Sequence, residues 1–238
     1  MGNTVGRLQS LFPPHQLDVI IGTLLGDGRL ECRSRGIRVF PITARLRIQH
    51  SEKQKDYVFW KYRILKNFVS RGPRKIMVWY DRKRNKKHYS WYFHTRSSEK
   101  FGLLHQYFYQ KKKKIFPENI SGLITPRVLA VWFMDDGSNT KKSFTLNTHC
   151  FSFKEQVRIA RFLKNRYDIS PTIVKDRTKH KIAIGRLEYE KFTRIIEPFI
   201  IPSMIYKIVN PRNDFAFLKQ DRGKIKPLSH VGIQSSGD

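Results

Sequence analysis

One apolar segment that ends in an acid and a glycine occurs twice in this chain. The first copy, Ile20–Gly28, reads IIGTLLGDG, and the second, Leu129–Gly137, reads LAVWFMDDG. An apolar run that stops at glycine is typical of a buried helix with a glycine C-terminus. The acids of the two Asp-Gly pairs lie 136 − 27 = 109 residues apart. We therefore expect two buried helices in a chain built from two similar halves.

The hydrophobic pattern around each copy also repeats, alternating helical and strand-like periods. It predicts the order helix-strand-strand-helix-strand-strand-helix twice, which is an α+β fold of two pseudo-symmetric αββαββα halves. Two antiparallel sheets with basic faces would then form a curved saddle. We expect helices at 17–25, 56–69, 97–110 (with Ser97 as N-cap), 125–136, 154–167 and 188–198, and strands at 45–50, 75–81, 87–95, 143–148, 172–176 and 181–185.

The repeat also predicts the boundaries of the halves. Residues 1–14 are a polar lead-in that ends in Pro13-Pro14, and residues 15–110 form the first half. Residues 111–121, with four lysines, are the natural basic linker. Residues 122–218 form the second half, and residues 219–238 are a loose polar tail.

The charge of the chain indicates a polyanionic partner. Forty-seven Lys and Arg against nineteen Asp and Glu give a net charge of +28, and self-repulsion of that size disfavours compaction unless a polyanion relieves it. Nucleic acid fits best, although a ribosomal protein or an anionic membrane surface would also explain the charge. No apolar run approaches the ~20 residues that span a bilayer. Two widely separated cysteines favour a reducing, intracellular compartment.

The acids at the two helix ends need an explanation beyond stability. Because a helix C-terminus carries partial negative charge, an aspartate there is disfavoured. A neighbouring cation would explain Asp27 and Asp136, and packing of the two helices would bring these carboxylates together. Magnesium prefers such oxygen ligands and retains waters, and it would activate a water and stabilise the leaving oxygen of a phosphodiester. Alternatively, each Asp-Gly pair merely ends its helix.

These segments resemble the LAGLIDADG homing endonucleases, specifically the single-chain subgroup with two motifs encoded in organellar introns. The resemblance is carried by both motif copies, by Leu146–Phe153 (LNTHCFSF) and by Ile201–Lys207 (IPSMIYK), and covers roughly residues 15–210. It implies that the motif helices form the interface between the halves. It also implies a monomer that cleaves both strands of a long double-stranded DNA site and leaves short 3′ overhangs.

The resemblance further implies roles for individual residues. Asp27 and Asp136 become ligands of two or three Mg²⁺ ions, which Mn²⁺ or Ca²⁺ could replace in binding, and the preceding Gly26 and Asp135 are counted with the metal site. Lys114 and Lys207 would polarise the attacking water or stabilise the charge of the phosphorane. His50 and His149 stand where the family often has a glutamine that orders water. As alternatives, Lys114 faces solvent with its neighbouring lysines, and both histidines are structural.

Strand residues of one parity should reach base edges, since they share one face of a sheet, while a basic loop tip should contact phosphates. The alternative for each is a solvated surface charge. The candidates are Arg38, Arg45, Arg47 and Gln49 in the first half, Lys175, Arg177, Lys179 and Lys181 in the second, and Arg82, Lys83, Arg84, Lys86 and Lys87 at the loop tip.

Three rival functions remain open. An intron RNA-splicing maturase on the same fold would have the same charge and core. A DNA-binding protein without catalysis would be indicated by loss of one acid, and both acids are present. A ribosomal-type protein has no use for two buried acidic helix ends. Because genes of the resembled subgroup lie in organelles, we expect a mitochondrial or chloroplast location.

Overall fold

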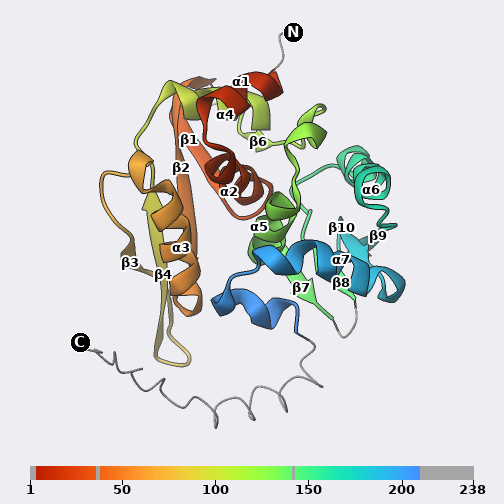
Figure 1. Ribbon diagram of the computed structural model, residues 1–238. Helices are drawn as coiled ribbons and strands as arrows, with labels where there is room; N and C mark the ends of the chain where they lie inside the picture. Colours follow the sequence, from red (N-terminus) through yellow and green to blue (C-terminus); the bar gives the residue numbers. More distant parts are fainter. Residues whose placement is uncertain (1–3, 36–37, 141–142, 210–238) are drawn as a thin grey trace, which may run out of the picture.

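The structure is a computed structural model that describes residues 4–35, 38–140 and 143–209. It contains the predicted element order twice (Figure 1). The first half comprises α2 (Pro14–Leu25), β1 (Arg29–Arg35), β2 (Arg38–Ser51), α3 (Lys55–Leu65), β3 (Arg74–Asp81), β4 (Lys86–His94) and α4 (Glu99–Phe108). The second comprises α5 (Pro126–Asp136), β7 (Gly137–Asn139), β8 (Phe144–Leu146), α6 (Phe153–Tyr167), β9 (Thr172–Asp176), β10 (Lys179–Ile184) and α7 (Tyr189–Ile196).

Each half contains one four-stranded antiparallel sheet, and both sheets have the same topology. The strand order is β1-β2-β4-β3 in the first sheet and β7-β8-β10-β9 in the second. The two sheets lie on opposite sides of the central helices α2 and α5 (Figure 1). The predicted α+β fold with two pseudo-symmetric halves is therefore confirmed.

The central helices pack closely because glycine lies at their contact. A Cβ atom added to Gly22 would lie 2.6 Å from Val131 Cβ, and one added to Gly26 would lie 2.4 Å from Asp135 Cβ. Both distances are well inside van der Waals contact, so only glycine lets the helices approach this far. The first helix contributes no side chain at these two points, and the second contributes Val131 and Asp135. The interface is therefore asymmetric.

The boundaries of α5 follow from local chemistry that the sequence already shows. The side chain of Thr125 accepts a hydrogen bond from Val128 N, and Pro126 occupies the first turn, where its missing N–H costs nothing. The predicted start at Thr125-Pro126 is confirmed. The N-cap of α4 is Ser98 rather than the predicted Ser97, and its side chain makes no capping hydrogen bond.

Two segments expected to be irregular contain regular structure. Within the predicted lead-in, α1 (Thr4–Leu11) forms a helix that buries Leu8 completely. The predicted linker contains strand β6 (Lys113–Lys114), which pairs with β5 (Tyr109–Gln110), and the start of a 3-10 helix, Ile120–Leu123. Apolar side chains from both segments pack against the core, which explains why these segments contain regular structure. The predicted tail, 219–238, lies outside the described residues.

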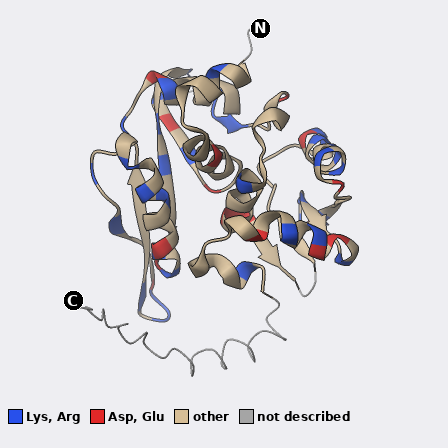
Figure 2. Cartoon of the chain, in the orientation of Figure 1, with Lys and Arg blue, Asp and Glu red and all other residues tan. Residues whose placement is uncertain are grey.

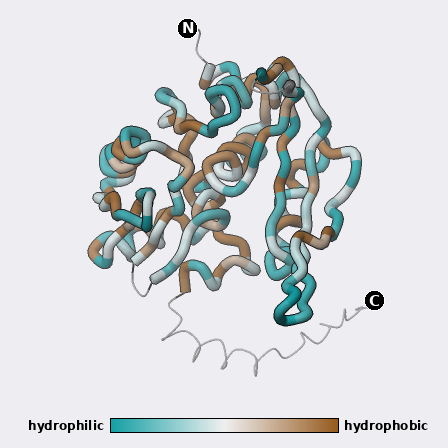
Figure 3. The backbone as a smooth tube through the Cα atoms, turned by 180° about the vertical axis from the view of Figure 1, so that it is seen from behind, coloured by the Kyte–Doolittle hydropathy of each residue, from teal (hydrophilic) through white to brown (hydrophobic). Residues whose placement is uncertain are grey.

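Along β2, one face of the first sheet is buried under helices and the other carries polar side chains. In β2, Ala44, Leu46 and Ile48 are buried, whereas the alternating residues between them are only partly buried. Figure 3 shows hydrophobic residues along the central helices and hydrophilic residues at the tip of the β3–β4 hairpin. Within the described residues, none of the helices combines the length and the apolar character required to span a bilayer.

Candidate functional site

Two carboxylates from different halves meet at the ends of the central helices. Asp27 follows α2 and Asp136 is the last residue of α5; Asp27 N donates to Oδ2 of Asp135, the residue before Asp136, at 3.3 Å, and each carboxyl group shifts the pKa of the other. Burial and the neighbouring charges of Asp27 and Asp135 raise the pKa of Asp136 to about 8. Burial and Asp135 also raise the pKa of Asp27. This like-charge pair is unfavourable unless a cation or a shared proton lies between the carboxyl groups.

The chemistry of these groups fits a hard divalent cation. Mg²⁺ and Ca²⁺ bind carboxylate and carbonyl oxygens, and Mg²⁺ retains several waters. The site offers the carboxylates of Asp27 and Asp136 beside the main-chain carbonyls of Gly26 and Asp135. Among the described residues, no group of three His, Cys, Asp or Glu side chains could hold a metal ion. Phosphate oxygens and water would therefore have to complete the coordination.

Two lysines bind the ends of the central helices in pseudo-symmetric positions. Lys114 Nζ donates to Gly26 O and Gly28 O, both at 2.8 Å. Lys207 Nζ donates to Met134 O at 2.5 Å and to Asp135 O at 3.1 Å. Burial lowers the pKa of both ammonium groups. The structure thus brings both predicted lysines to the carboxylate pair and rules out a solvent-facing Lys114.

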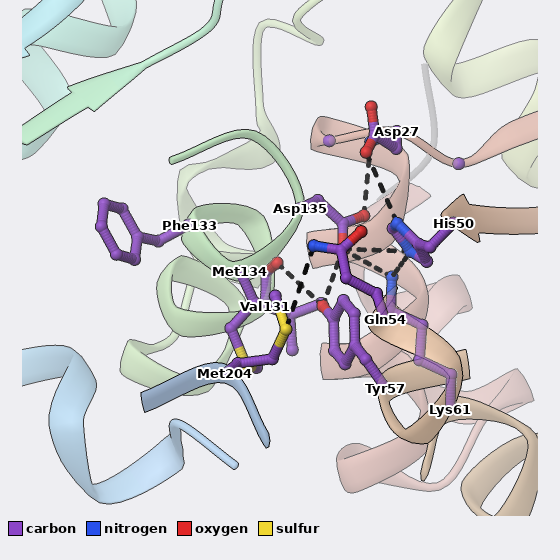
Figure 4. A network of polar contacts seen from close by, with 12 residues as sticks. Asp27, His50, Gln54, Tyr57, Lys61, Val131, Phe133, Met134, Asp135 and Met204 are labelled. Atoms are coloured by element: carbon purple, nitrogen blue, oxygen red, sulfur yellow. Dashed lines mark hydrogen bonds and ion pairs between the residues drawn. The ribbon is translucent and has the colours of Figure 1, made fainter. Parts of the chain in front are cut away.

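Asp135 does not present its carboxylate to this pair. Its side chain is completely buried, and Oδ1 accepts hydrogen bonds from Lys61 Nζ at 2.6 Å and Tyr57 Oη at 2.7 Å (Figure 4). Oδ2 accepts from Asp27 N at 3.3 Å. Burial alone would raise the pKa of Asp135, but Lys61 and Tyr57 outweigh it and hold that pKa below its usual value. Only the main-chain carbonyl of Asp135 is left as a candidate metal ligand, which corrects the prediction that counted the whole residue with the metal site.

The two predicted histidines have different surroundings. His50 is buried, with Nδ1 3.6 Å from Asp27 Oδ2 and Nε2 3.2 Å from Lys61 Nζ. Burial and the Lys61 ammonium lower the pKa of His50 to about 3, so the ring is neutral. The contact of His149 is instead with Asp176 Oδ2 at 3.1 Å, on the second sheet. The two histidines therefore have different partners, and the Asp27 contact is made by His50.

The polar face of the first sheet adjoins the carboxylate pair. Asp27, Arg47, Gln49 and His50 line one hollow of about 320 Å³. Cross-strand pairing places Arg45 and Arg47 on the same face as Gln49, as the alternation predicts. Tyr92 lies opposite Gln49 and 5.1 Å below the Arg47 guanidinium. Cross-strand partners in β1, β3 and β4 add five residues to this face that were not predicted from the sequence. They are Arg29, Glu31, Arg74, Tyr92 and His94.

The second sheet corrects one DNA-contact prediction. Ile182 is buried under the helices, and Lys179 and Lys181 have the opposite parity. Lys175 pairs with His180, whose ring packs against Phe153 of α6, so the register directs Lys175 away from the face of Lys179 and Lys181, although its side chain is exposed at the edge of the sheet. Arg177 lies in the β9–β10 turn with φ 56°. Arg38, at the start of β2, is exposed. The predicted phosphate-contacting residues at the β3–β4 tip are exposed as well; they are Arg82, Lys83, Arg84, Lys86 and Lys87. Figure 2 shows basic residues at that tip and along α6.

Lys61 and Tyr57 are not among the residues predicted from the sequence, although one feature of the pattern marks Lys61. The buried positions of α3 are Tyr57, Val58, Lys61 and Leu65, and their three- and four-residue spacing defines its core-facing side. A lysine on such a side has to find a buried partner, because an unpaired charge there is costly. The partner, Asp135, lies 135 − 61 = 74 residues away in the other half, which a local pattern cannot reveal.

Comparisons with known proteins agree with this fold. A model of the LAGLIDADG DNA endonuclease family matches residues 17–192. DNA endonuclease I-ChuI of Chlamydomonas applanata is 32% identical over 81% of this chain and 94% of its own length. Cytochrome b mRNA maturase bI2 of Saccharomyces cerevisiae is 29% identical over 88% of this chain but only 50% of its own length. The solved structure of homing endonuclease I-WcaI bound to its DNA recognition sequence superposes with a TM-score of 0.74, at 26% identity, covering 86% of this chain and 92% of that chain.

Proposed function

Because this chain belongs to the LAGLIDADG DNA endonuclease family, we propose that it is a site-specific homing endonuclease. It hydrolyses one phosphodiester in each strand of a long, asymmetric DNA duplex with divalent metal and leaves short 3′ overhangs. The observation that carries the proposal is the meeting of Asp27 and Asp136. One carboxylate comes from each half, and Asp27 lines the same hollow as Arg47 and Gln49 of the first sheet.

The polar faces of the sheets supply binding and orientation. Arg45, Arg47 and Gln49 form a row of donors and acceptors suited to base edges. Lys83 and the other exposed basic residues of the β3–β4 tip suit phosphates, whose contacts position a duplex without reading its sequence. A duplex laid along both sheets would place its centre at the carboxylate pair. Each strand would then pass one aspartate and one lysine.

The groups at the centre would share the chemistry of hydrolysis. A divalent ion bound by Asp27, Asp136 and the Gly26 and Asp135 carbonyls would lower the pKa of bound water and stabilise charge on the phosphate. Lys114 and Lys207 hold their ammonium groups at the helix ends, where they attract the scissile phosphates. Their positive charge opposes the negative charge that builds up in the transition state.

The experiment is cleavage of a random-site DNA library with Mg²⁺, followed by sequencing of the cut ends. We expect one long site and short 3′ overhangs, and we expect chelation of the metal to stop cutting. Asp27→Asn and Asp136→Asn should abolish cutting and leave affinity for the recovered site largely intact. Asp168→Asn is the matched control, because Asp168 is an exposed acid paired with lysines on the outer side of α6. Full cleavage by either motif variant would refute the assignment.

A second candidate, an intron RNA maturase, is favoured by the similarity to the yeast maturase over 88% of this chain. That relative also supports the proposal of an organellar location, since it acts on the cytochrome b mRNA. The two functions are separable by one pair of measurements. A maturase restores splicing of an intron RNA whether or not Asp27 is intact, whereas DNA cutting requires that carboxylate. Binding of the DNA site without cutting would instead indicate a non-catalytic regulator.

A further inference from the structure

The buried lysine at the interface of the halves has no role in the chemistry proposed above. Lys61 is completely buried, and its ammonium lies 2.6 Å from Asp135 Oδ1 and 3.2 Å from His50 Nε2. Both neighbours also contact Asp27. Asp135 Oδ2 accepts its main-chain N–H at 3.3 Å, and His50 Nδ1 lies 3.6 Å from its carboxylate. Two routes therefore connect Lys61 with one of the two metal-binding acids, and Figure 4 shows both.

The route through His50 depends on which ring nitrogen carries the proton. An ammonium group only donates hydrogen bonds, and Nε2 lies closer to Lys61 Nζ, at 3.2 Å, than to Asp135 Oδ1, at 3.7 Å, so we assign Nε2 as the acceptor from Lys61. The proton of the neutral ring is then on Nδ1, which faces Asp27 Oδ2. Without the ammonium, nothing in this contact forces that tautomer. Lys61 thus determines that His50 presents an N–H group, rather than a lone pair, to the carboxylate.

The route through Asp135 depends on charge. A carboxylate in a completely buried position stays ionised only if a partner compensates it, and the partner is Lys61 with the Tyr57 hydroxyl as a second donor. The ionised Asp135 can accept the N–H of Asp27 on its second oxygen. Lys61 therefore holds both the main chain and the side chain of Asp27 through intermediaries.

The second half lacks this arrangement at every corresponding position. The buried residues of α6 are Glu155, Gln156, Ile159 and Leu163, with the same spacing as Tyr57, Val58, Lys61 and Leu65 of α3, so Ile159 takes the place of Lys61. The residue that matches Asp135 in the first motif, 135 − 109 = 26, is Gly26. The lysine and its partner acid are thus missing together from the Asp136 side. This joint absence indicates that the two residues serve one purpose.

We propose that Lys61 is a positioning residue that acts through His50 and Asp135 on Asp27 more than on Asp136, and so makes the two strand cleavages depend unequally on Lys61. The inference rests on the proposed nuclease function. Residues behind metal ligands typically change metal affinity or activity 10–100-fold when they are removed. Loss of Lys61 should therefore slow one strand about 10–100-fold more than the other.

The first test uses the metal-free protein and does not depend on cleavage. Imidazole nitrogen NMR distinguishes the two tautomers of neutral histidine. We expect His50 in the wild type to carry its proton on Nδ1, and Lys61→Met to shift it toward Nε2 or a mixture. An unchanged His50 spectrum in Lys61→Met would overturn the inference.

The second test measures the two strands separately on the recovered site, with a different label on each. Lys61→Met should change the ratio of the two rate constants by about 10–100-fold, whereas equal slowing or no slowing overturns the inference. Lys164→Met is the matched control, because it removes the exposed Lys164–Asp168 pair of α6, and the ratio should stay that of the wild type. A wild type that does not cut overturns the proposed function instead.

Removal of Lys61 alone could unfold the protein, since it leaves Asp135 buried without its partner. The double variant Lys61→Met with Asp135→Leu removes both charges, and such replacements commonly keep a fold. We expect this variant to melt near the wild type, to bind the DNA site and still to show the altered strand ratio. If recovery of the melting temperature also restores both rate constants, the pair is merely structural and the inference is wrong.

Discussion

The contact between the central helices predicts the effect of one substitution quantitatively. In Gly22→Val, the new Cβ would lie 2.6 Å from Val131 Cβ and 2.8 Å from the Val128 carbonyl oxygen. Ordinary contact begins at 3.4 Å, so the helices would have to separate by roughly 3.4 − 2.6 = 0.8 Å. Both opposing atoms belong to rigid parts of α5, so the strain cannot be relieved by rotating a flexible side chain.

The magnitude follows from the cost of overpacking a core, about 1–3 kcal/mol. The rigidity of the contact places Gly22→Val near the upper end, and the better helix propensity of valine returns about 0.5 kcal/mol. We expect the free energy of unfolding to fall by about 2–3 kcal/mol and the melting temperature by about 5–10 °C for a chain of this length. Cutting should fall as well, because the same helices carry both acids.

Urea and thermal unfolding followed by circular dichroism would measure this loss. Gly185→Ala is the control, because no atom lies within 4 Å of its added Cβ and the φ of −71° suits alanine. Its melting temperature should stay close to that of the wild type. If Gly22→Val also melts within about 1 °C of the wild type, the close contact of the helices does not exist as described.

Three further predictions use the charges of the protein. Since the pKa of Asp136 is raised to about 8, the stability linked to its proton is present below pH ~4 and is lost as the pH rises toward 8. Without metal, Asp136→Asn should therefore have a higher melting temperature than the wild type at pH 8 but not at pH 4, and Mg²⁺ should reduce the difference. Equal melting temperatures at both pH values would contradict the repulsion between the acids. Burial would raise the pKa of Glu155, but hydrogen bonds from Ser152 and Phe116 N outweigh burial and lower that pKa. The stability that the Glu155 carboxylate contributes is therefore present above pH ~4.5 and is lost as the pH falls through the lowered pKa. Glu155→Gln should reduce the urea midpoint at pH 7 and have little effect at pH 3, and a constant difference would refute this. DNA affinity should fall steeply with salt, and Lys83→Ala should reduce the slope by about 1 if Lys83 contacts one phosphate; a flat salt response would exclude phosphate-dominated binding.

The sequence was sufficient where local chemistry determines the structure. The ends of α5 are marked by Thr125 and Gly137, and the alternation of β2 places Arg45 and Arg47 on one face before any coordinates are known. The duplicated order of elements also fixed the fold class. In each case the deciding interaction lies within a few residues of the feature that it determines, or the same pattern occurs twice.

The sequence was insufficient where residues from both halves meet. The side-chain role of Asp135 depends on Lys61 and Tyr57, and neither can be paired with it by spacing. The face of Lys175 depends on its register with β10, which a one-residue change would reverse. His149 follows the same internal alignment as His50 but contacts Asp176, because β8 ends at Leu146 and His149 lies in the turn that follows, whereas His50 is a buried position of β2.

The asymmetric contact of the two central helices means that neither half can replace the other. Two copies of the first half would bring glycine against glycine and leave a void where Val131 now packs. Two copies of the second half would press valine against valine and bury two Asp135 carboxylates, with no lysine to neutralise them. A symmetric dimer of either half would therefore need a repacked contact between its central helices.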